Sequence, residues 1–213
     1  MIERKKKNPW RAFAGAAIVL SVAAIAGQGV LASLNATAFN TVAQNVDAGT
    51  MKLNLAAGAN SAGFTSNINL LAPGDVVNRY VTLTNNGSLD GKDLKLTVAA
   101  TSANSVIVDA TKGLKLTVLS CNQAWDVSTG LCNGAAGTTE IAQKAVGGWN
   151  VTNLASGTMN SGDLKYLKMS LQLPDQNETT VNGVAPATSI QGATAALTYT
   201  FDLAQRAATT TNS

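Results

Sequence analysis

Cys121 and Cys132 are the only cysteines in this chain of 213 residues, and ten residues lie between them. Two thiolates are too few for a four-thiolate zinc or iron–sulfur site, and the spacing is not that of a C-x-x-C redox pair. In an oxidising compartment such a pair normally closes. The spacing therefore predicts a structural disulfide, and closing so short a loop would stabilise the fold by about 3 kcal/mol.

Histidine is absent from the whole sequence. Its absence excludes Ser-His and Cys-His catalysis, His-ligated zinc and a histidine pH switch. Asp90 and Asp93, beside Asn85 and Asn86, carry oxygen atoms that suit calcium, but their order does not match an EF-hand loop. Solvated turn acids are the commoner explanation. We therefore expect no catalytic residue, no bound metal and no cofactor, and we predict that the protein is not an enzyme.

The positive charge of the chain is concentrated at its beginning. The formal net charge is +3, but five cations stand in the first eleven residues against the single anion Glu3. After residue 32, ten cations face eleven anions, which gives a net charge of −1. A nucleic-acid-binding protein needs a basic surface that displaces counterions from phosphates. The sequence therefore argues against nucleic acid as a partner.

This beginning has the three parts of a secretory signal peptide. A basic cluster is followed by an uncharged apolar run and then by small and polar residues. We predict a signal peptide over residues 1–32, cleaved between Ala32 and Ser33, with a cut before Phe39 as the second choice. An uncleaved anchor over residues 12–34 would just span a bilayer of roughly 30 Å, but its alanines and glycines make it weak. We expect the mature protein outside the cell, away from the membrane.

The rest of the chain alternates apolar and polar residues with the two-residue period of half-buried strands. In the segment 166–173, for example, every second residue from Leu167 is leucine or methionine. Strands are expected at 51–55, 76–85, 92–98, 105–110, 113–118, 166–173 and 196–203, with turns at pairs such as Asn182-Gly183. The pattern predicts an all-β fold, an antiparallel two-sheet sandwich of jelly-roll type with about 8–10 strands. It would occupy residues 50–205, and residues 206–213 would form a disordered tail.

Three stretches of the sequence carry a likeness to a known family. They are residues 48–55, residues 70–98, which hold a PGD turn and an NNGS turn, and residues 189–205. The signature positions are Pro73, Gly74, Asp75, Arg79, Asn85 and Gly87, with Leu71, Ser88 and Leu89. Together they resemble the TasA/CalY (camelysin) family of exported matrix proteins, which have a SipW-type signal peptide. Residues 100–163 match nothing in the family pattern, and the cysteine pair departs from its best-known fibre-forming member.

The resemblance implies a jelly-roll sandwich that forms extracellular filaments in the biofilm matrix of a Gram-positive bacterium. In such filaments the freed N-terminal segment, here residues 33–49, acts as a donor strand that pairs with an open sheet edge of the next subunit. Head-to-tail contacts of this kind do not close, so they produce filaments. Phe39, Val42 and Val46 are the expected donor-strand anchors. The plain alternative is that residues 33–49 form the protein's own first strand or a loose leader.

Other functions and partners stay open at this stage. The implied partner is another copy of the chain, with other matrix or cell-surface proteins possible and signal peptidase needed during export. One alternative function is a monomeric cell-surface adhesion module. The other is a camelysin-like protease, because some family members carry a metalloprotease label. This sequence has neither an HExxH motif nor any histidine to support that label.

Three further side chains have two interpretations each. Arg79 shares the alternation of Val77 and Val81, so it either pairs with a carboxylate such as Asp75 or is turned outward by a bulge, and we favour the bulge. Trp125 and Trp149 lie in turn-rich stretches. They could form an exposed sugar platform, but tryptophans that cover the end of a sandwich are more common.

Overall fold

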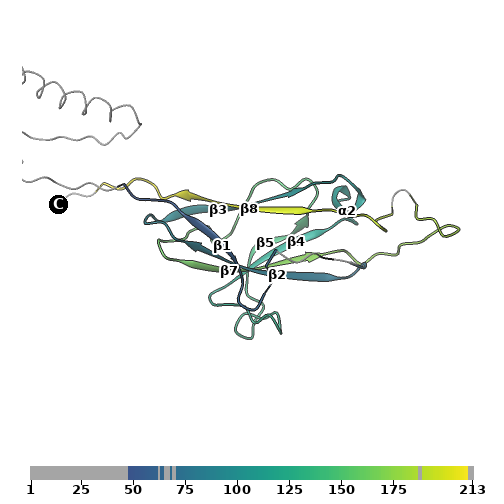
Figure 1. Cartoon of the computed structure of the whole chain (residues 1–213), viewed down its shortest axis with the longest axis horizontal. Helices are drawn as coiled ribbons and strands as arrows, with labels where there is room; N and C mark the ends of the chain where they lie inside the picture. Colours follow the sequence, from purple (N-terminus) through teal and green to yellow (C-terminus); the bar gives the residue numbers. More distant parts are fainter. Residues whose placement is uncertain (1–47, 62, 65–67, 69–70, 187–188, 211–213) are drawn as a thin grey trace, which may run out of the picture. The chain divides into compact units, whose positions relative to one another are not determined.

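The computed structural model describes residues 48–61, 63–64, 68, 71–186 and 189–210. These residues form eight strands and one short helix, which confirms the predicted all-β class (Figure 1). The elements are β1 (Leu53–Ala57), β2 (Val76–Asn85), β3 (Gly91–Ala100), α2 (Ser105–Val108), β4 (Lys115–Cys121), β5 (Thr138–Ala145), β6 (Thr152–Asn153), β7 (Leu164–Gln172) and β8 (Leu197–Gln205).

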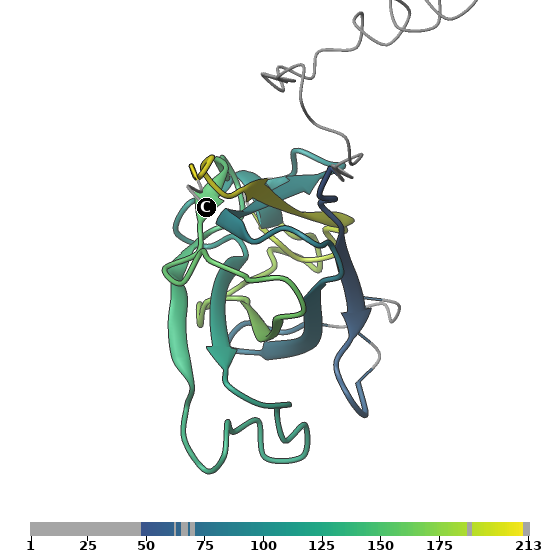
Figure 2. The ribbon, with the colours of Figure 1, turned by 90° about the vertical axis from the view of Figure 1, so that its left-hand side faces the viewer.

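The strands form two antiparallel sheets of unequal width. One sheet has five strands in the order β1-β2-β7-β4-β5, and the other has three in the order β6-β3-β8. On one side of the sandwich, β5 and β6 are joined by side chains, since Lys144 Nζ donates a hydrogen bond of 2.8 Å to Thr152 Oγ1. On the other side lie the outer strands β1 and β8 (Figure 2).

The core lies between the two sheets and is built from the alternating positions. Leu94 and Leu96 of β3 and Leu167 and Met169 of β7 are almost completely buried, and the residues between them are more exposed. One face of each central strand is therefore dry and the other wet, as the two-residue period predicts. This alternation, rather than any local motif, is what determines the sandwich.

The segment 105–110 was expected to be a strand, and this prediction is wrong, because residues 105–108 form the short helix α2. Its run of β-branched residues suggested a strand, but the segment connects the two sheets and has no neighbouring strand to pair with. The amide of Leu114 bonds back to the carbonyl of Val106, and the amide of Gly113 bonds to that of Asp109. Val106 and Ile107 still reach the core, so burial is satisfied by a tight turn instead.

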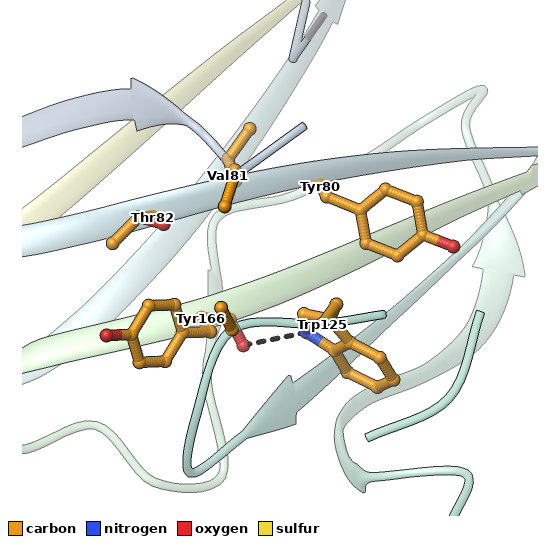
Figure 3. Close-up of a pocket in the computed structure, with 8 residues that line it drawn as sticks. Tyr80, Val81, Thr82, Trp125 and Tyr166 are labelled. Atoms are coloured by element: carbon orange, nitrogen blue, oxygen red, sulfur yellow. Dashed lines mark hydrogen bonds between the residues drawn. The ribbon is translucent and has the colours of Figure 1, made fainter. Parts of the chain in front are cut away.

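The predicted disulfide between Cys121 and Cys132 is present, with 5.6 Å between the two Cα atoms. It closes the loop between β4 and β5. The loop packs on the outer face of the wide sheet through Trp125, whose Nε1 donates to the carbonyl of Tyr166 at 3.1 Å (Figure 3). Trp125 and Trp149 are both buried, so neither offers a sugar platform.

Candidate assembly site

In the part of the chain that the structure describes, no strand completes the side of the sandwich between β1 and β8. Among the described strands, β8 pairs only with β3 and β1 pairs only with β2. Phe64, which follows β1, stacks on Tyr199 of β8 with 4.6 Å between ring centroids, so the loop after β1 touches the narrow sheet. Each outer strand leaves one row of backbone donors and acceptors without a sheet partner, which is the usual template for strand addition.

The inner face of β1 is uncovered at its middle. Leu55 pairs in register with Leu83, so both side chains point toward the interior of the sandwich. Leu83 is 0% exposed, whereas Leu55 is 42% exposed. The narrow sheet ends at β8 and does not extend over β1. The sequence correctly placed Leu55 on the apolar face, but the prediction that this face is buried fails here, because none of the described strands extends the narrow sheet over it.

The inner face of β8 is only half covered as well. Its inward residues alternate in the expected way, but none of them is fully buried: Leu197, Tyr199, Phe201 and Leu203. Their register partner strand β3 has Leu94 and Leu96 at complete burial in the same layer. Burial, partly offset by the nearby positive charge of Arg79, raises the pKa of the Tyr199 hydroxyl to about 12. A strand beside β8 would cover this row of apolar side chains.

Arg79 lies on the inner face of β2, at the same open side. The ladder from β2 to β7 is regular, with Arg79 opposite Met169, so the bulge expected at this position is absent. Asp75, the carboxylate named as a possible partner, accepts the amide of Ala72 through its Oδ2 at 2.8 Å within the PGD turn. Arg79 is half-buried and its charge acts on Tyr199 across the sheets. The arginine of the signature thus faces the strand whose edge is open.

The turn that contains Asn85 and Gly87 fixes the place where the N-terminal segment joins the domain. Asn85 is fully buried, and its Nδ2 donates to the carbonyls of Leu89 at 2.9 Å and Met159 at 3.0 Å. The amides of Asn86 and Ser88 donate to the carbonyls of Lys52 and Thr50. A Cβ on Gly87 would overlap the Thr50 carbonyl oxygen, so only glycine fits.

The PGD turn performs a similar task at the other end of β2. Gly74 has φ +91, a conformation that favours glycine, and its amide donates to the carbonyl of Leu173 at 2.9 Å. The turn therefore joins the start of β2 to the end of β7. The two turns of the signature thus hold β2 and the start of β1 in place.

A buried ionic cluster was not predicted from the sequence. Glu140 of β5 has a fully buried side chain, and Lys165 Nζ lies 3.6 Å from its Oε1. The amide of Ser156 donates to Glu140 Oε2 at 2.7 Å, and Lys165 Nζ donates to Ser156 Oγ at 2.7 Å. Register irregularities in the β4–β5 ladder beside Val118 place Glu140 and Ile141 both inward. Alternation alone would have placed the carboxylate in solvent, so no sequence pattern could have revealed it.

The chemistry of this cluster is structural. Burial favours the neutral form of Glu140, but hydrogen bonds from Ser120 and Ser156 and the charge of Lys165 outweigh it, and the pKa of the carboxyl is lowered. Ser156 and Lys165 are arranged like the serine and lysine of some hydrolases. Here Lys165 Nζ also lies 3.6 Å from Glu140 Oε1, so an ion pair with a buried carboxylate holds this lysine. The cluster links the wide sheet to the loop after β6.

The residues of the chain do not fit a hydrolytic zinc ion. The sequence has no histidine, and both cysteines are in the disulfide. Within the described residues, no three acidic or cysteine side chains gather in a way that could hold a metal ion. Asp90 Oδ1 accepts the amide of Ser161 at 3.0 Å, and Asp93 lies 3.9 Å from Lys92, so the two proposed calcium ligands are engaged separately.

Several sequence predictions concern residues outside those that the structure describes. They are the signal peptide, the cleavage point between Ala32 and Ser33, and the donor-strand anchors Phe39, Val42 and Val46. Ala48 and Gly49, the last residues of the expected donor segment, are described and exposed. In the part of the chain with described coordinates, no helix is long and apolar enough to cross a membrane.

Comparison with known proteins agrees with the family suggested by the signature. No significant match was found among individually curated proteins. The family model described as camelysin metallo-endopeptidase matches residues 6–210, which is nearly the whole chain. The sequence has neither a histidine nor a free cysteine as a zinc ligand for the enzymatic part of that description, and the all-β fold is the class that the resemblance implied. The chain therefore belongs to the camelysin (TasA/CalY) family.

Proposed function

We propose that the mature protein is a secreted structural subunit that assembles into extracellular biofilm-matrix filaments by donor-strand exchange. Residues 33–49 of one subunit would add a strand beside β8 of the next. The observation that supports this most strongly is the uncovered inner face at Leu55 together with the unpaired outer edge of β8. Main-chain hydrogen bonds would give affinity, and alternate apolar side chains would set the register.

The donor sequence suits one face of this site. In an extended strand Val42 and Val46 lie on one face and Phe39 lies on the other, because side chains alternate. Val42 and Val46 would enter the open side between β1 and β8, beside the inward row of β8. Phe39 can join them only across a bulge, and otherwise it covers the outer face. This refines the three expected anchors into a pair with one role and a single residue with another.

Exchange between molecules is favoured over insertion into the same molecule by strand direction. Every strand pair in the described sheets is antiparallel. We call the end of the sandwich that holds residues 50–52 and 86–90 the proximal end, and the end that holds Val76 and Leu197 the distal end. β8 runs toward the proximal end, where residues 50–52 are fixed by the Ser88 turn. A donor segment from the same chain would also run toward that end and would have to pair in parallel.

Two forms of the protein test this proposal, one starting at Ser33 and the other at Thr50. Both are concentrated under oxidising conditions and examined by electron microscopy and sedimentation. Filaments from the longer form alone are expected. If both forms stay folded and monomeric, donor-strand assembly is wrong and a monomeric adhesion module becomes the better explanation. Filaments from both forms would place the assembly contact elsewhere on the domain.

A further inference from the structure

The connection from β7 to β8 carries a hairpin that the sandwich does not need. It leaves the distal end after Leu173 and returns at Leu197, and Figure 1 shows it extending beyond the strand ends on the right. Residues 179–186, which we call the finger, lie at its tip. Long connections without regular structure are uncommon in compact domains, where they are either functional or linker segments.

The tip of the finger is a tight hydrogen-bonded turn. Val181 and Val184 exchange backbone hydrogen bonds of 2.9 and 3.0 Å. Between them, Asn182 and Gly183 both have positive φ, 51° and 76°, as the tight two-residue hairpin turn requires. Val181 and Val184 are directly opposite each other, so their side chains lie on the same face.

This turn holds two apolar side chains in solvent. Val181 is 66% exposed and Val184 is 69% exposed, the highest values among the large hydrophobic residues that the structure describes. A single exposed valine needs no explanation, but a fixed pair at the tip of a projecting hairpin is a small contact surface.

The base of the finger is anchored by buried polar groups. Glu178, whose side chain is 10% exposed, accepts a hydrogen bond of 2.5 Å from Ser189 Oγ and lies 3.9 Å from Lys112 Nζ. Gln176 Nε2 donates to the carbonyl of Lys112 at 3.2 Å, and Ser105 Oγ donates to the carbonyl of Ser189 at 2.8 Å. Burying a carboxylate is costly, so these contacts indicate that the position of the finger is maintained.

The proposed assembly determines which part of the neighbouring subunit faces the finger. A donor segment that pairs antiparallel with β8 must run from the proximal to the distal end of the acceptor, because β8 runs the other way. Its residue 47 then emerges at the distal end, beside the finger. Residue 48 begins the folded domain of the donor subunit, whose own proximal end must therefore face the finger of the acceptor. At that end Leu164 is 54% exposed and Met51 is half-buried, so apolar surface is available.

We propose that the finger is a second contact between subunits, in which Val181 and Val184 pack against the proximal end of the subunit that donates its strand. This second contact rests on the proposed function. The donor strand tethers the neighbour, and the finger fixes its orientation. Contacts at two places act together through a high effective concentration, so loss of the finger should weaken assembly without removing the donor site.

The test compares the mature chain from Ser33 with the double variant Val181→Ser/Val184→Ser. The control is Val151→Ser, because Val151 is a similarly exposed valine, at 60%, and lies away from both ends. Three properties are measured: the melting temperature, the affinity for a synthetic peptide of residues 33–49, and the critical concentration for filament formation. We expect the double variant to keep the melting temperature and the peptide affinity of the natural chain. Its critical concentration for filament formation should rise at least tenfold. The control should assemble as the natural chain does.

The possible results separate the finger from the donor strand. An unchanged critical concentration in the double variant overturns the finger contact and leaves donor-strand exchange standing. Absence of peptide binding and of filaments in the natural chain overturns both. A photo-crosslinker at position 184 checks the geometry, and in filaments it should mark the neighbour at residues 48–52, 86–90 or 158–164. Crosslinks confined to other regions, or none between subunits, would also reject the proposal.

Discussion

Leu55 and Leu83 stand side by side on the inner face of the wide sheet, yet Leu83 is fully buried and Leu55 is 42% exposed. The difference arises because the narrow sheet ends at β8, before it reaches β1. A complete sandwich would bury both residues. The domain therefore has the core of a sandwich and one uncovered side, and the proposed function follows from that uncovered side.

Val46→Asp in the donor segment should abolish filaments while the domain stays folded. A charge among the apolar side chains of the open side would be removed from water, which is unfavourable. The matched control is Asn45→Asp, which adds the same charge on the opposite face of the strand. Sedimentation after concentration measures the effect. Equal loss in both variants would indicate that charge alone, and not the face of the strand, controls assembly.

Gly87→Ala should destabilise the domain and loosen the start of β1. The new Cβ would meet the Thr50 carbonyl, which accepts the amide of Ser88 at 2.9 Å. Backbone must move to relieve the overlap, and we expect a loss of about 1–3 kcal/mol. Urea unfolding measures the loss. Gly134→Ala is the control, because a Cβ at Gly134 meets nothing within 4 Å. The control carries its own strain, since Gly134 has φ +81, so a loss at Gly87 that does not exceed it would contradict this account.

Cys121→Ser/Cys132→Ser should lower the free energy of unfolding by about 3 kcal/mol, the value for closure of a short loop. Trp125 is held by this loop, so its fluorescence should shift toward that of an exposed indole. The open side lies elsewhere, and binding of the 33–49 peptide should persist below the new melting temperature. A variant with unchanged stability would show that the packing of Trp125 alone holds the loop.

Glu140 should make the domain sensitive to acid. Its pKa in the folded state lies below the ordinary value of 4.5, so the folded state binds protons less readily than the unfolded chain. The stabilisation is therefore complete above about pH 5 and is lost as the pH falls through the folded-state pKa. Glu140→Gln should cost about 3 kcal/mol at neutral pH, because it leaves Lys165 without its charge partner. Its stability should also vary less between pH 5 and pH 3, and an equal slope in both proteins would contradict the assignment.

The family description raises an enzymatic activity that can be tested directly. The chain offers no histidine and no free cysteine as a zinc ligand. Purified protein, incubated with zinc and with a denatured protein substrate, should give no cleavage that a chelator removes. If cleavage is seen, Glu140→Gln tests its origin, since Glu140 is the fully buried carboxylate of the described residues and lies next to a serine and a lysine. Chelator-sensitive cleavage that survives further purification would reject a purely structural role.

The sheet pattern could be predicted from the sequence, and its exceptions have physical causes. Central strands such as β7 have neighbours on both edges and a covering sheet, so alternation alone determines which residues are buried. Leu55 is exposed because it lies at an uncovered edge, and Val106 is helical because it lies in a connection between the sheets. Both surroundings are determined by distant parts of the chain. Glu140 could not be foreseen, because a local irregularity of the ladder turns it inward. The Asn182-Gly183 turn could be predicted from the sequence. That Val181 and Val184 are exposed, and that polar contacts hold the base of the finger, could be seen only in the structure.

The most direct test of the account is amide hydrogen exchange on the domain from Thr50, with and without a peptide of residues 33–49. β8 has nine residues and one free edge, so alternate amides of this strand should exchange freely in the domain alone. The peptide should protect these outward amides of β8 and no comparable set in β5. Protection that appears at another edge, or no protection at saturating peptide, would contradict donor-strand assembly at β8.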